Sequence, residues 1–120
     1  QDFLASFARL AGQTLPAEAG PDSLDVWDAL TGKDRKGRVH IVEHARALSY
    51  REGDWKMIEA NDGPRINRGT NTELGTGAKA QLYNVAKDRG EQMDVAAQYP
   101  EKVQTLQAAL EKIRKGGRSR

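Results

Sequence analysis

The sequence predicts an α+β fold: an antiparallel sheet of about four strands that is backed by a C-terminal helix and preceded by a short amphipathic helix. Two apolar patterns lead to this prediction. Apolar residues recur at helical spacing near both ends of the chain, whereas the middle holds short β-branched and aromatic runs. The length of 120 residues suits one ordinary core, and 19 basic residues nearly balance 17 acidic ones. This balance excludes disorder driven by net charge.

The first third of the chain predicts two short helices. Phe3, Leu4, Phe7 and Leu10 share one face of a helix over residues 2–11, which Gly12 ends. Two prolines and a glycine make residues 13–23 a connection. A second helical turn is predicted over residues 24–30, followed by Gly32.

The middle of the chain predicts the sheet. Three strands are expected around residues 39–42, 48–51 and 55–58, and the turn residues 52–54 join the last two as a hairpin. A fourth strand is expected at residues 81–85. Residues 61–79 contain four glycines and almost no apolar side chains, which predicts a long exposed loop.

The final helix is predicted from Pro100 to the Gly116-Gly117 pair. Its apolar positions 103, 106, 110 and 113 step by 3, 4 and 3 residues and so share one face. Trp55 and Tyr83 are expected in the core, with Trp55 over Leu106 and Leu110 of this helix.

Composition excludes several kinds of site. With no cysteine, the sequence has no disulfide, no cysteine-based zinc site and no thiol nucleophile. No apolar run reaches the roughly 20 residues of a membrane helix, so no membrane span is expected. The chain opens on Gln1 without a basic leader, and we expect it to be a piece of a longer protein.

The residues themselves indicate neither a catalytic group nor a metal site. His40 and His44 are four residues apart on a predicted strand, which separates them by about 13 Å, so they cannot share one metal ion. Asp25 and Asp28 lie on one helical turn, but two carboxylates alone are poor evidence for calcium.

The C-terminal end is basic. Residues 101–120 carry six basic and two acidic side chains. Such an end complements the helix dipole, and it also suggests an alternative function, a small polyanion-binding module that uses the basic C-terminal helix. Nucleic acid is not an expected partner.

Four blocks of sequence, in order, resemble the sulfatase family of the alkaline phosphatase superfamily, of arylsulfatase type. The segments are Asp2-Phe3-Leu4 to Leu10-Ala11-Gly12, Asp22-Ser23-Leu24 to Leu30-Thr31-Gly32, Leu48 to Ile58 with Gly53-Asp54-Trp55-Lys56, and Leu82-Tyr83-Asn84-Val85 to Pro100-Glu101. In the same order, they are similar to that family's Asp-Leu-x-Pro-Thr helix, the Asp-Gly-x-Ser-Leu segment that follows it, its hairpin, and its Leu-Tyr-Asn strand with the Pro-Glu-x-Val helix. The sequence departs from the family at Arg89, which stands where the family has a turn proline.

The resemblance implies a C-terminal fragment of a sulfatase, a sulfuric ester hydrolase that acts on sulfated glycans or aryl sulfates. It implies that residues 1–32 are the end of the catalytic α/β domain with a connection, and that residues 33–120 are the C-terminal subdomain. The family's nucleophile, a formylglycine from a Cys/Ser-x-Pro-x-Arg motif, is absent from this sequence. We therefore expect the fragment to be inactive alone and without a cofactor. The family likeness places formylglycine and calcium in the missing N-terminal catalytic domain of a periplasmic or secreted parent.

Four residues are candidates for contact with substrate. His44 ends a strand where the family resemblance places a histidine, and the adjacent Arg46 adds a positive charge suited to a sulfated sugar. Arg65 and Arg68 lie in the Gly-rich loop, whose composition suits a lid over a cleft. An ordinary surface loop is the alternative interpretation. A parent that has lost catalysis and only binds is a further possibility.

Overall fold

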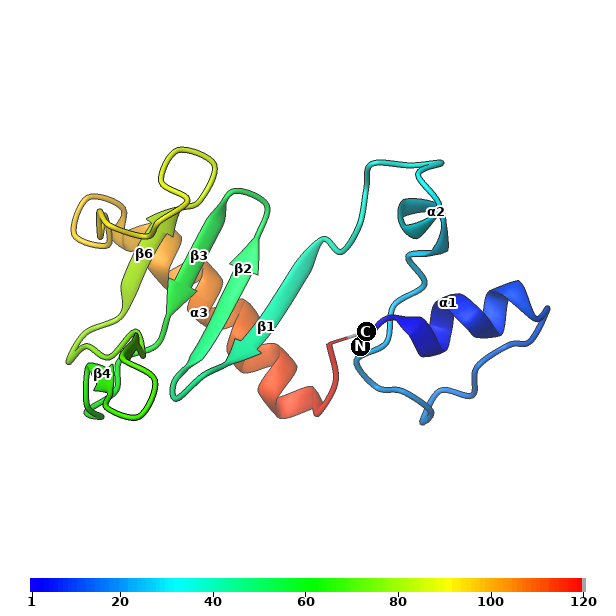
Figure 1. Cartoon of the computed structure of the whole chain (residues 1–120), viewed down its shortest axis with the longest axis horizontal. Helices are drawn as coiled ribbons and strands as arrows, with labels where there is room; N and C mark the ends of the chain where they lie inside the picture. The colour runs from blue at the N-terminus through cyan, green and yellow to red at the C-terminus, as the bar shows by residue number, and fades with distance from the viewer. Residues whose placement is uncertain (120) are drawn as a thin grey trace. The chain divides into compact units, whose positions relative to one another are not determined.

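The computed structural model describes residues 1–119 (Figure 1). The elements follow the chain as α1 (Phe3–Leu10), α2 (Trp27–Leu30), β1 (His40–His44), β2 (Leu48–Glu52), β3 (Trp55–Ile58), β4 (Ile66–Asn67), β5 (Thr72–Glu73), β6 (Gln81–Asn84) and α3 (Pro100–Gly116). The chain forms two compact units, His40–Glu111 and Gln1–Val39 with the residues from Lys112 onward. The predicted division at residue 32 concerns the parent protein and stays a prediction.

The larger unit is built on an antiparallel sheet of four strands in the order β1-β2-β3-β6. Tyr50 of β2 pairs with Met57 of β3, and Met57 pairs in turn with Leu82 of β6. Since paired residues point to the same side of a sheet, these three side chains share one face. The predicted α+β class and the four main strands are confirmed.

Helix α3 covers that face of the sheet (Figure 1). The core consists of Met57 and Leu82, both fully buried, together with Leu106 and Leu110, which are 2% and 1% exposed. Each of these side chains contributes roughly 1.5–3 kcal/mol by leaving water. Gly117 follows the helix with a φ of +65°, the left-handed conformation that favours glycine at a helix end. The opposite face of the sheet is thereby left for other contacts.

Trp55 lies on the α3 side of the sheet but is only half-buried. Its ring packs edge-on against Tyr99 at 5.2 Å, and the Lys102 ammonium lies 6.0 Å from its centroid. These contacts are at the beginning of α3, so the expectation of a central core position was wrong. Tyr83, in contrast, is buried as predicted, although on the other face of the sheet.

The loop over residues 61–79 is partly ordered by a small hairpin, which the sequence did not predict. Strands β4 and β5 pair Ile66 with Glu73 and Asn67 with Thr72. The amide of Asn61 donates to the carbonyl of Gly77 at 2.8 Å and closes the neck of the loop. The loop is thus largely exposed, as predicted, and it also contains a small hairpin.

The smaller unit is held by polar contacts of helix α1 and the connection that follows it. The carboxylate of Asp2 accepts from Arg38 Nε at 2.5 Å and Arg38 Nη2 at 2.7 Å, and it also accepts from the amide of Leu24. The Ala5 amide donates to Ser23 Oγ, and Ser119 donates to Asp22 from both its amide and its hydroxyl.

The two carboxylates considered for calcium are engaged by an arginine. Arg9 donates to Asp25 at 3.2 Å and to both oxygens of Asp28 at 2.9 and 3.1 Å. The ion pairs of both carboxylates with one guanidinium explain why two acidic side chains lie close together here. Within residues 1–119, no group of three or more His, Asp and Glu residues is placed to hold a metal ion.

Helix α1 carries an exposed apolar face. Phe3, Phe7 and Leu10 are 58%, 52% and 59% exposed, and the rings of Phe3 and Phe7 stack at 5.4 Å. The Phe7 ring also meets Trp27 edge-on at 6.3 Å. So much aromatic surface on one short helix is typical of a face that another part of a protein covers. Among the described residues, no helix is long and apolar enough to cross a membrane.

Candidate functional site

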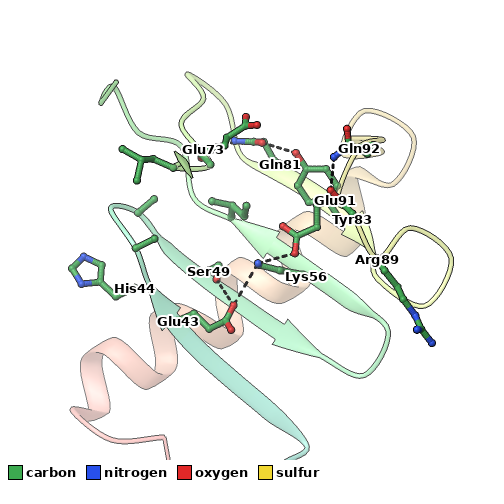
Figure 2. Close-up of a pocket in the computed structure, with 16 residues that line it drawn as sticks. Glu43, His44, Ser49, Lys56, Glu73, Gln81, Tyr83, Arg89, Glu91 and Gln92 are labelled. Atoms are coloured by element: carbon green, nitrogen blue, oxygen red, sulfur yellow. Dashed lines mark hydrogen bonds and ion pairs between the residues drawn. The ribbon is translucent and has the colours of Figure 1, made fainter. Parts of the chain in front are cut away.

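A cavity of about 510 Å³ lies over the sheet face opposite α3 (Figure 2). Side chains from all four strands of the sheet form its floor, and the segments around Gly75 and Glu91 form its walls. A cavity of this size falls within the range of roughly 300–1,000 Å³ that small-molecule sites occupy. The alternation of the strands explains its floor, because every second residue of β1, β2, β3 and β6 points to this side.

Lys56 lies at the centre of the site between two carboxylates (Figure 2). Its Nζ is 2.9 Å from Glu91 Oε1 and 3.4 Å from Glu43 Oε2, and its side chain is 18% exposed. Ser49 donates to the same Glu43 oxygen at 3.4 Å. The two carboxylates outweigh the single ammonium, so the centre of the cavity carries a net negative charge.

Glu91 reaches Lys56 from an unusual backbone conformation. Its φ of +51° is left-handed, which costs a non-glycine residue roughly 1–2 kcal/mol. The carboxylate of Asp88 fixes the turn by accepting from the amides of Gln92 at 2.7 Å and Met93 at 2.8 Å. The turn therefore holds the Glu91 side chain over the sheet.

One wall is fixed by a chain of hydrogen bonds. The Tyr83 hydroxyl donates to Gln81 Oε1 at 2.6 Å, and Gln81 Nε2 donates to the carbonyl of Gly75 at 2.9 Å. Burial raises the pKa of Tyr83, and nearby carboxylates, including Glu91, raise it further. Tyr83 therefore stays protonated, and the direction of the shift agrees with the negative charge of the cavity.

The four substrate-contact candidates lie at the rim of this cavity or beyond it. His44 ends β1, and its side chain points away from the cavity (Figure 2). Arg46 lies against Gly63, where an added Cβ would overlap the Nε of Arg46. Arg65 pairs with Glu73 at 3.3 Å, and Arg68 is exposed in the turn between β4 and β5. Their role in substrate contact stays a prediction.

Sequence reasoning missed the residues that form the cavity, namely Glu43, Ser49, Lys56, Gln81 and Glu91. Strand alternation could have placed Lys56 on the opposite face of the sheet from Trp55, and Glu43 on the same face as Ser49. Nothing local indicates that Glu91 returns to Lys56, because the two residues are 35 positions apart. Chemically, the arrangement offers hydrogen-bond acceptors of negative charge and a rigid amide wall.

The comparisons with known proteins identify relatives of this chain. No protein-family model matches it. It is 40% identical over 115 residues to an N-acetylgalactosamine-6-O-sulfatase of Bacteroides thetaiotaomicron, and the match covers 94% of this chain but 22% of that protein. A solved structure described in connection with the metabolism of multiple glycosaminoglycans by the same organism superposes with a TM-score of 0.89 at 40% identity, over 95% of this chain and 24% of that one.

A more distant structure agrees on the fold. A 2-O GAG sulfatase superposes with a TM-score of 0.62 at 21% identity, and the match covers 95% of this chain and 24% of that protein. The chain therefore spans about a quarter or less of the proteins it matches. The alternative of a separate polyanion-binding module finds no support among these relatives. The chain is a homologue of the C-terminal part of the sulfatases.

Proposed function

We propose that this chain is the C-terminal part of a sulfatase that removes sulfate from sulfated glycans, and that it supports the catalytic domain while contributing to the substrate cleft. The observation that carries the proposal is the 40% identity over 115 residues to an N-acetylgalactosamine-6-O-sulfatase. That identity extends over nearly the whole of this chain. A sulfated N-acetylgalactosamine residue is therefore the first substrate to test.

The apolar face of α1 supports the structural part of this proposal. Phe3, Phe7 and Leu10 are each more than half exposed, although each is of a size that normally lies in a core. The catalytic domain of the parent is the partner that we expect to cover them. This agrees with the predicted assignment of residues 1–32 to the end of that domain.

Three arginines and a histidine near the cavity support a role in substrate choice. We propose that His44, Arg46, Arg65 and Arg68 contact anionic groups of the glycan at the edge of the cleft. Guanidinium groups suit this task because they bind sulfate and carboxylate with paired hydrogen bonds. The nucleophile and the cation that binds the sulfate belong to the missing domain in this proposal, as does the signal for export to the periplasm or the exterior.

The test compares the isolated chain with the full-length parent. We expect the isolated chain to release no sulfate from N-acetylgalactosamine 6-sulfate or from an aryl sulfate, whereas the parent releases it. Release of sulfate by the isolated chain above a buffer control would contradict the proposal. In the parent, His44→Ala and removal of the 61–79 loop should lower kcat/KM for a sulfated oligosaccharide about tenfold, equivalent to about 1.4 kcal/mol, and leave aryl sulfate turnover nearly unchanged.

A further inference from the structure

We infer that the cavity over β1, β2, β3 and β6 binds hydroxyl groups from an unsulfated part of the sugar through Glu43 and Glu91, and that it disfavours sulfate. This inference rests on the proposed function, because it assigns the cavity to the same glycan substrate. It separates two kinds of recognition in one small domain. Cationic side chains at the edge would contact anionic groups, and the acidic cavity would bind neutral ones.

The charges of the cavity argue against sulfate. Lys56 is the cation nearest its centre, but carboxylate oxygens lie 2.9 and 3.4 Å from its ammonium. A sulfate beside Lys56 would therefore meet Glu43 and Glu91 at close range, in a partly buried place where charges are weakly screened. Arg89 also lines the cavity, but its guanidinium points away from it (Figure 2).

The free oxygens of the two carboxylates suit hydroxyl donors. Lys56 contacts Oε2 of Glu43 and Oε1 of Glu91, so the other oxygen of each accepts no hydrogen bond from the residues that the structure describes. Ionised carboxylates are acceptors only, and a sugar hydroxyl is a donor that can meet them in a strong, charge-assisted hydrogen bond. The side chains of Glu43 and Glu91 are 50% and 30% exposed, so a ligand can reach them.

The site is also held in place before any ligand arrives. The ion pair with Lys56 fixes Glu91, whose backbone is already held by the turn at Asp88. The hydrogen bonds from Tyr83 to Gln81 and from Gln81 to Gly75 fix the opposite wall. Groups that do not have to be ordered on binding lose less conformational entropy, which favours affinity.

The experiment measures inhibition of the full-length parent by two small molecules, N-acetylgalactosamine and inorganic sulfate, in the variants Glu43→Gln and Glu91→Gln. We expect each variant to weaken inhibition by N-acetylgalactosamine about tenfold, since one charge-assisted hydrogen bond becomes a neutral one. Inhibition by inorganic sulfate should stay as in the wild type. Glu101→Gln, an exposed acid on α3, is the matched control and should change neither value.

Opposite outcomes would overturn the inference. If the wild-type cavity binds sulfate at Lys56, the variant Lys56→Met weakens inhibition of the parent by inorganic sulfate, and that result would overturn the inference. Unchanged inhibition by N-acetylgalactosamine in both variants would show that the carboxylates do not contact it. Glu91→Gly is a second variant that removes the carboxylate and should still fold, because the left-handed backbone at position 91 favours glycine. Binding of N-acetylgalactosamine to the parent can also be measured directly by calorimetry, which tests the cavity even if the wild-type parent releases no sulfate. The absence of sulfate release would count against the proposed function alone.

Discussion

The ion pair between Asp2 and Arg38 should dominate the stability of the smaller unit. The two side chains are 18% and 11% exposed, and two hydrogen bonds of 2.5 and 2.7 Å join them. In addition, Arg38 Nη1 is buried without a hydrogen-bond partner among the described residues. The substitution Asp2→Asn would therefore leave a buried guanidinium with no opposing charge.

Removal of one partner from a buried ion pair typically costs 3–5 kcal/mol. Because this pair is largely but not fully buried, we expect Asp2→Asn to cost about 3 kcal/mol of unfolding free energy at pH 7. Arg38→Met should cost a similar amount. The double variant should lose clearly less unfolding free energy than the sum of the two single losses, because it leaves neither charge unpaired.

Tryptophan fluorescence can isolate this unit in urea unfolding. The sequence has two tryptophans, so a Trp55→Phe background leaves Trp27, which lies in the smaller unit, as the sole reporter. The control is Arg9→Met, which breaks an exposed pair and should change stability far less. A loss below about 0.5 kcal/mol for Asp2→Asn, or additive single variants, would refute the reasoning.

The same pair predicts the direction of a pH dependence. Burial acts to raise the pKa of Asp2, but hydrogen bonds from Arg38 and the Leu24 amide, with the charge of Arg38, outweigh it and lower the pKa below 3.8. The stabilisation is therefore complete above pH 3.8 and is lost as the pH falls through the lower folded value. The wild type and Asp2→Asn should converge in stability over that acid range. Parallel profiles would contradict this account.

Three further variants test other parts of the fold. Phe7→Ser should lower the unfolding free energy of the parent by about 1 kcal/mol more than that of the isolated chain, because the half-exposed ring gains its remaining burial only in the parent. Equal losses of unfolding free energy in urea would count against a covered face. Trp55→Ala should cost roughly 2 kcal/mol, less than the 3–5 of a full core truncation, and thermal unfolding measures it. Glu91→Gly should exceed Glu91→Ala in stability by about 1 kcal/mol, since only glycine relieves the left-handed backbone, and equal stability would show no strain there.

Local patterns explain which parts of the fold could be predicted. The strands around residues 48–58 and helix α3 carry their own periodicity, and the structure places them within a residue or two of the prediction. Strands β4 and β5 have two residues each, too few to show alternation, and depend on backbone hydrogen bonds such as Leu74 to Arg65. Trp55 was placed too deep, because alternation gives the face of a strand but not the position along the helix above it.

The candidate site was the least predictable part. The sequence suggested the arginines of the 61–79 loop, since arginines in a Gly-rich loop are visible without a structure, but these arginines do not line the cavity. The cavity joins β1 and β3 to a turn far along the chain, and only the folded chain brings Glu43, Lys56 and Glu91 together. Long-range pairing of this kind leaves no signal in spacing or composition.

The contact between Arg46 and Gly63 offers a way to move a charge without removing it. A methyl group at position 63 would overlap the guanidinium stem, and a long flexible side chain can yield at little cost. Gly63→Ala would thus redirect Arg46 while the composition of charges stays the same. Evolution or a protein engineer could retune the proposed contact between the loop and a glycan through this glycine, and a comparison limited to charged residues would overlook the change.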